Sequence, residues 1–193
     1  MASGTLIKDG PAVEAMSAVS ARFAPHLPGN DFKFRFEVVK DSSVNAFAAP
    51  GGLVVVNTGL LAKATSIDQL AGVLGHEIVH VTRRHSLRQI LYSLGLMTTI
   101  QWAFGIPEGA SVTIAGAAAD LSSLKFGRDQ ESEADAEGIE LLQRARLPAS
   151  GLPSLFDMLA EEKISVPAFL STHPADEQRK ASLERLISER GAQ

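Results

Sequence analysis

The stretch GVLGHEIVHVTRRH, from Gly72 to His85, carries three of the five histidines in the chain. His76 and His80 are four residues apart, so on an α-helix both imidazoles project from one face and could bind the same metal ion. Glu77 cannot join that coordination and is instead placed to take a proton from a water molecule that the metal has acidified. Two ligands and one general base at this spacing predict a hydrolytic zinc centre.

A catalytic zinc ion also needs a third protein ligand and an open fourth position, and the segment RDQESEADAEGIELL offers candidates. Glu131 and Asp135 are four residues apart on a predicted helix and share one face. Glu131 is the candidate third ligand, and Asp135 is the candidate acceptor for the second ring N–H of a ligating histidine. Glu133 and Glu137 lie off that face and are expected to be solvated. The alternative of a purely solvated helix is disfavoured by an apolar side made of Ala134, Ile139 and Leu142.

Two other histidines are left out of the predicted site. His85 follows two arginines and lies off the face of His76 and His80, and His26 sits in a proline-rich turn. Both are predicted to be surface or packing residues.

The overall composition narrows the possible chemistry. None of the 193 residues is cysteine, so a metal would have nitrogen and oxygen ligands, and thiol nucleophiles are excluded. A net charge of −4 does not favour nucleic acid as a partner. The length and the ordinary apolar content predict that residues 1–193 form a single catalytic domain.

The predicted elements give a mostly helical α+β fold. Apolar and polar residues alternate in FKFRFEVV, from Phe32 to Val39, which predicts a half-buried strand. Two apolar runs flank Pro50-Gly51-Gly52, which predicts a hairpin. These segments are expected to form a small antiparallel sheet between Phe32 and Asn57.

The motif helix is predicted to begin after Ser66, which with Gln69 forms a capping-box pattern, and to run from Ile67 to about Gln89. The apolar stretch at 90–106 is expected to be a buried helix, with peripheral membrane contact as the less favoured alternative. Further helices are predicted at 11–24, 86–104, 110–125, 129–145, in GLPSLFDMLAEEK, and from Pro174 to about Glu189.

Taken together, HEIVH at 76–80, ESEAD at 131–135 and NAFA at 45–48 resemble the gluzincin metallopeptidases related to the CAAX prenyl protease. That group includes HtpX-like, Oma-type and BepA-like proteases, and the resemblance covers about residues 38–179. It implies one zinc ion held by His76, His80 and Glu131, with Glu77 as the base and Asp135 behind the ligands.

The resemblance also implies roles for residues outside these motifs. The segment holding Asn45, Ala46 and Phe47 would be an edge strand that lines the active site and binds a polypeptide substrate as an added strand. In STHPADEQR, His173 would stabilise the transition state, supported by Arg179. In BepA-like relatives the equivalent histidine can instead occupy the zinc and block water, so both roles for His173 stay open.

The sequence therefore predicts a zinc metalloendopeptidase, with misfolded or envelope proteins as possible substrates in protein quality control. The alternative is a latched zinc-containing chaperone or scaffold protein that cleaves little. A bacterial cell-envelope location is favoured. The N-terminus lacks the apolar segment of a signal peptide, so a signal or anchor is expected to be missing from this sequence.

Overall fold

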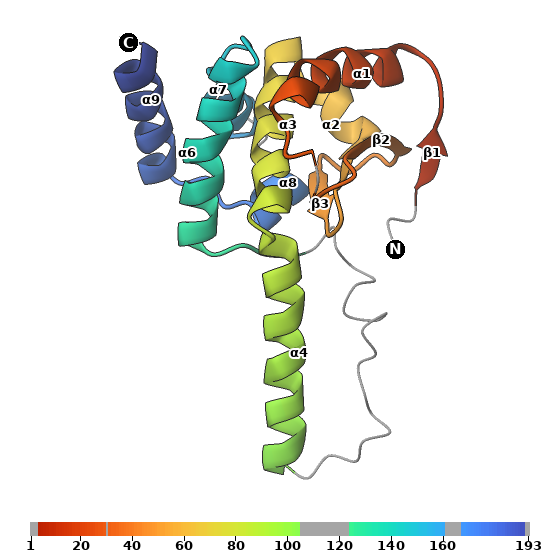
Figure 1. Cartoon of the computed structure of the whole chain (residues 1–193), viewed down its shortest axis with the longest axis vertical. Helices are drawn as coiled ribbons and strands as arrows, with labels where there is room; N and C mark the ends of the chain where they lie inside the picture. The colour runs from red at the N-terminus through yellow and green to blue at the C-terminus, as the bar shows by residue number, and fades with distance from the viewer. Residues whose placement is uncertain (1–3, 30, 105–123, 161–166, 192–193) are drawn as a thin grey trace.

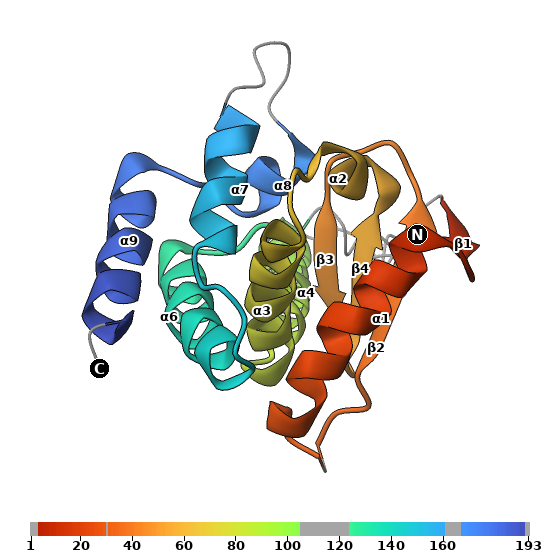
Figure 2. The ribbon, with the colours of Figure 1, turned by 90° about the horizontal axis from the view of Figure 1, so that it is seen from above.

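The computed structural model describes residues 4–29, 31–104, 124–160 and 167–191, and side chains at 96–104 are left out of the description. A four-stranded sheet forms one side of the molecule, and helices pack against it around the central helix α3, Ile67–Thr82 (Figures 1 and 2). The predicted mostly helical α+β class is confirmed. The predicted helix at 110–125 falls almost entirely outside the described residues.

The sheet is mixed, which corrects the prediction of an antiparallel one. Its strands are β1 (Thr5–Ile7), β2 (Arg35–Lys40), β3 (Ala46–Ala49) and β4 (Leu53–Asn57), in the order β1-β2-β4-β3. The predicted hairpin is present, because β3 and β4 pair antiparallel across a turn in which Gly51 and Gly52 have φ of 90° and 106°. The hairpin joins β2 through its second strand, which runs parallel to β2. This arrangement leaves β3 at the predicted edge.

Helix α3 is the best buried element, since every residue from Gln69 to Val81 is buried. The predicted cap is present, because the Ser66 hydroxyl accepts the N–H of Gln69 at 3.3 Å. The Gln69 side chain accepts the N–H of Thr65 at 2.8 Å, so the return bond of the capping box is displaced by one residue.

Glycines lie where two other helices approach α3 closely. A Cβ atom built at Gly138 of α6 (Arg128–Arg144) would lie 3.4 Å from the backbone of Gly75 and of His76. A Cβ atom at Gly72 would meet the backbone nitrogen of Leu152, in α7 (Gly151–Ala160), at 2.4 Å. Helix α6 therefore lies against the motif helix, close enough for its acidic side chains to reach the histidines.

The predicted helix from Ile67 to Gln89 is two helices. Arg84 adopts a left-handed conformation with φ of 57°, which interrupts the helical hydrogen bonds, and α4 (His85–Phe104) begins one residue later. Neither glycine nor proline marks this break, so no local sequence pattern predicts it.

Helix α4 extends away from the other helices (Figure 1). The expectation of a buried helix at 90–106 is wrong for the start of this stretch, while residues 105–106 lie outside the described residues. Ile90 is buried, but Leu91 and Tyr92 are 59% and 67% exposed. None of the helices that the structure describes is long and apolar enough to cross a membrane. Peripheral membrane contact by residues 90–106 stays a prediction, which vesicle co-sedimentation would test.

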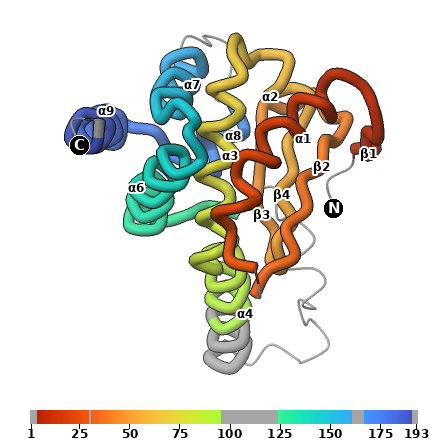
Figure 3. Tube along the Cα trace, turned by 45° about the horizontal axis from the view of Figure 1, so that its top comes forward, coloured from red at the N-terminus to blue at the C-terminus, as the bar shows by residue number. Residues whose placement is uncertain are grey.

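The remaining elements enclose the core. Helices α1 and α6 lie on opposite sides of α3 (Figure 3). The last helix begins at Glu177 instead of Pro174, and the Asp176 carboxylate accepts the N–H of Arg179 at 2.8 Å in its first turn. The other bounds are α1 Pro11–Phe23, η1 Ala24–His26, α2 Thr58–Lys63, α8 Ala168–Thr172 and α9 Glu177–Gly191.

Candidate metal centre and active site

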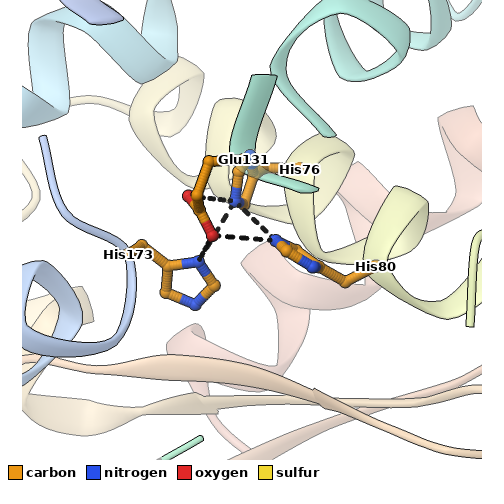
Figure 4. Close-up of side chains that lie close together, drawn as sticks. All are labelled: His76, His80, Glu131 and His173. Atoms are coloured by element: carbon orange, nitrogen blue, oxygen red, sulfur yellow. Dashed lines mark hydrogen bonds and ion pairs between the residues drawn. The ribbon is translucent and has the colours of Figure 1, made fainter. Parts of the chain in front are cut away.

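Four buried side chains from distant parts of the chain converge on one point (Figure 4). His76 and His80 come from α3, Glu131 from the first turn of α6, and His173 follows α8 directly. Their ligand atoms all lie within 4.8 Å of one another. The three residues predicted as metal ligands are thus brought together, and His173 joins them as a fourth.

The spacing of these atoms suits a single ion. The Nε2 atoms of His76 and His80 are 2.9 Å apart, and the Nδ1 atom of His173 lies 3.2 Å from His76 Nε2. Glu131 oxygens lie 3.0 Å from His173 Nδ1 and 3.5 Å from His80 Nε2. Tetrahedral zinc with bonds of about 2.0–2.1 Å separates its ligand atoms by about 3.3 Å. Nitrogen and carboxylate donors at these distances fit a zinc ion.

Glu77 lies beside this cluster without hydrogen-bond partners among the described residues. Its side chain is fully buried, and one carboxylate oxygen is 3.3 Å from His173 Nε2. Burial raises the pKa of Glu77, against the opposing effect of His173 and His76. A carboxylate with a raised pKa and free oxygens is suited to accept a proton at neutral pH.

Asp135 and Arg179 form the next layer behind His76. An Asp135 oxygen lies 3.0 Å from His76 Nδ1, where Asp135 was predicted to meet a ligating histidine. Arg179 donates to both Asp135 oxygens at 2.6 and 2.8 Å, and its Nη1 lies 2.5 Å from Glu131. Arg179 therefore places one positive charge against two buried carboxylates.

In this layer, neighbouring charges and hydrogen bonds shift the pKa values of His76 and Asp135 in the direction opposite to the effect of burial. Burial lowers the pKa of His76, but Glu131 and Asp135 outweigh it and raise that pKa to about 9. Burial raises the pKa of Asp135, but the hydrogen bonds from Arg179 and His76 outweigh it and lower that pKa.

A second layer, which the sequence did not predict, lies behind His80. His85 was predicted to be a surface or packing residue, and it is indeed buried, but its Nδ1 lies 2.9 Å from His80 Nδ1. Its Nε2 lies 2.9 Å from Glu133, which was expected to be solvated and whose side chain is 36% exposed. The turn at Arg84 is responsible, because on an unbroken helix His85 would point away from His80.

The strand predicted to bind substrate is present as β3. Its three predicted contact residues are all buried, but in different surroundings. Asn45 is buried before the strand, Ala46 faces the main core, and Phe47 packs with Val39 and Val55 on the other face of the sheet. A substrate would therefore meet Ala46 through its backbone and not through its methyl group.

The free edge of β3 exposes backbone groups of Ala46 and Ala48, and the carbonyl of Ala48 already accepts a hydrogen bond. Asn57 N–H donates to the Asn45 carbonyl, and pairing alternates along antiparallel strands, so the backbone groups of Ala46 and Ala48 point away from β4. The Ala48 carbonyl accepts the Ser86 hydroxyl at 2.7 Å.

A His-Glu-x-x-His helix whose histidines meet a distant glutamate in a buried polar cluster defines a metallopeptidase-type centre. Comparison with known proteins agrees: the model of peptidase family M48 matches residues 12–187. The chain belongs to peptidase family M48, a family of zinc metalloendopeptidases.

Curated relatives match most of the chain. It is 30% identical over 192 residues to the β-barrel assembly-enhancing protease of Escherichia coli strain K12, covering 93% of this chain and 39% of that protein. It is 32% identical to the mitochondrial metalloendopeptidase OMA1 of Schizosaccharomyces pombe, covering 83% and 48%, and 35% identical to that of Bos taurus, covering 83% and 34%. The chain thus spans less than half the length of each of these relatives.

Proposed function

We propose that this chain is the catalytic part of a zinc metalloendopeptidase, with zinc held by His76, His80 and Glu131. The observation that carries the proposal is the convergence of these three buried side chains from two helices at zinc-like spacing. Membership of family M48 supports the same conclusion.

The chain's own residues supply the proton transfers. When bound, zinc would act as a Lewis acid that polarises the scissile carbonyl and acidifies the attacking water. Glu77 takes the proton from that water and delivers it to the leaving amine nitrogen. With zinc bound, Asp135 would accept a hydrogen bond from the Nδ1–H of His76, and the Nε2 lone pair of His76 would be left for the ion.

Removing the metal should abolish cleavage reversibly. Dialysis against a chelator should eliminate hydrolysis of an unfolded protein such as casein, and one equivalent of zinc should restore it. A tightly folded protein should resist cleavage if misfolded chains are the substrates. Full activity in metal-free protein, verified by elemental analysis, would contradict the proposal.

We further propose that an extended polypeptide binds by adding a strand to β3. The available groups are the N–H and carbonyl of Ala46 and the N–H of Ala48, which point to the edge of the sheet. Ala46→Pro removes one of these donors and should raise KM for casein several-fold, whereas Gly51→Ala, in the turn, should affect stability alone. An unchanged KM in a folded Ala46→Pro variant would argue against strand addition. A role for the Asn45 side chain in substrate binding is part of the same proposal.

The name of the Escherichia coli relative, the β-barrel assembly-enhancing protease, refers to β-barrel assembly. That name supports the further proposal that this chain acts in the bacterial cell envelope, in protein quality control. Cell fractionation with an antibody to the chain would test the location, and recovery in the cytoplasm alone would contradict it.

A second candidate function is a latched state that cleaves little, and one observation favours it. His173 Nδ1 lies in the ligand cluster, where a fourth protein ligand would take the coordination position that water needs. The alternative role, stabilising the transition state, requires His173 to leave that position.

We therefore expect His173→Ala to raise casein hydrolysis by about tenfold, the ratio that corresponds to about 1.4 kcal/mol for closing the latch. Steady-state rates at saturating zinc would measure it. Rates should be compared with those of His26→Ala, which changes a histidine outside the site. A fall in rate with zinc still bound would instead assign His173 to catalysis.

A further inference from the structure

The two α3 histidines differ in what stands behind them. His76 Nδ1 faces the carboxylate of Asp135 directly at 3.0 Å. His80 Nδ1 faces another imidazole, that of His85, at 2.9 Å. A carboxylate is present here too, but one step further away, because His85 Nε2 lies 2.9 Å from Glu133 Oε2.

The carboxylate of Glu133, at the end of this row of hydrogen bonds, determines which ring nitrogen of each histidine carries the proton. An ionised carboxylate can only accept, so Glu133 requires the proton of His85 on Nε2. His85 Nδ1 then carries a lone pair and accepts from His80, whose proton must be on Nδ1. The Nε2 atom of His80, which faces the cluster, is left with the lone pair that a metal requires.

We propose that His85 and Glu133 are positioning residues that fix the tautomer and ring orientation of His80 for metal binding. This inference rests on the proposed zinc site. It assigns to Glu133 and His85 together the role that Asp135 alone has behind His76.

The fold holds in place the hydrogen-bonded row of His80, His85 and Glu133, which we call the relay. The left-handed turn at Arg84 brings the first residue of α4 back beneath His80, and the Ser86 hydroxyl ties the start of α4 to the Ala48 carbonyl. The Phe126 ring lies 4.1 Å from the His80 ring between centroids and limits its rotation. His80 and His85 are both fully buried, so water does not compete for their ring nitrogens.

Long-range ¹H–¹⁵N NMR correlations of the imidazoles in zinc-loaded wild-type protein give the first test. We expect His85 as the Nε2–H tautomer, with an unprotonated Nδ1, and His80 with its proton on Nδ1. A proton on Nδ1 of His85 would overturn the proposal. This measurement needs no variant and does not depend on activity.

Zinc affinity, measured by competition with a chromogenic chelator, gives the second test. His85→Leu leaves the His80 N–H without an acceptor and should weaken zinc binding about 10- to 100-fold. His85→Asn keeps an acceptor oxygen near the Nδ1 position and should recover most of that loss. A His85→Leu variant that binds zinc as tightly as wild type, or an Asn variant no better than Leu, would overturn the proposal.

The chain offers a matched control on α6. Glu133 and Glu137 both pair with Arg83, but in the described structure it is Glu133 that reaches His85. Glu133→Ala should therefore weaken zinc binding and Glu137→Ala should not, and equal effects would count against the relay. If wild-type protein binds no zinc, the proposed function fails as well, whereas tight zinc binding with the opposite His85 tautomer rejects the relay alone.

Discussion

Glu77→Gln should lower kcat/KM for casein by about 10²- to 10⁴-fold while leaving one zinc ion bound. The substitution keeps the shape of the side chain and removes its ability to take a proton. Glu77 is no member of the ligand cluster, so metal content should not change. The measurement combines proteolysis rates with elemental analysis of the same sample.

Thermal unfolding separates this effect from a folding defect. Both Glu77 oxygens are buried without hydrogen-bond partners among the described residues, so replacing a charge by an amide should not lower the melting temperature. Glu14→Gln, at an exposed position of α1, is the matched control and should behave as wild type. Turnover near the wild-type rate in Glu77→Gln would reject Glu77 as the base.

Arg179→Met should lower the free energy of unfolding of zinc-free protein by about 3–5 kcal/mol. Arg179 is 9% exposed and pairs with Asp135 and Glu131, so its removal leaves two buried carboxylates without their cation. Urea denaturation would measure the loss. With zinc bound the loss should be smaller, because the ion would neutralise Glu131 in place of the guanidinium.

The control for this prediction lies on the same helix. Arg185 is 70% exposed and its pair with Glu189 is 4.0 Å long, so Arg185→Met should change stability by less than about 1 kcal/mol. Equal midpoints for Arg179→Met and Arg185→Met would contradict the buried-network interpretation.

Local spacing accounts for what the sequence predicted well. The i,i+4 rule placed His76 with His80 and Glu131 with Asp135 on shared helix faces, and both pairs do face the cluster. Strand alternation and the Pro50-Gly51-Gly52 turn predicted the hairpin in the same way. Each of these inferences depends on backbone geometry within a few residues.

The parts that sequence reasoning missed depend on contacts between distant segments. Strand β2 could pair with either strand of the β3–β4 hairpin, and it pairs in parallel with β4. The residue pattern of a single strand does not show which partner it takes. Likewise, burial of α4 depends on whether a neighbour covers it, so an apolar run did not reveal that Leu91 and Tyr92 would be exposed.

Residue types and their local spacing set the chemistry available to this protein: two imidazoles and a carboxylate on one helix, a second acidic helix, and no thiols. Tertiary structure alone decided that His85 stands behind His80 and that His173 enters the ligand cluster. The physical reason is that a single left-handed residue, Arg84, redirects the chain after α3, and that the packing around α8 sets the position of His173. Periodicity describes the faces of an unbroken element and carries no information about either event.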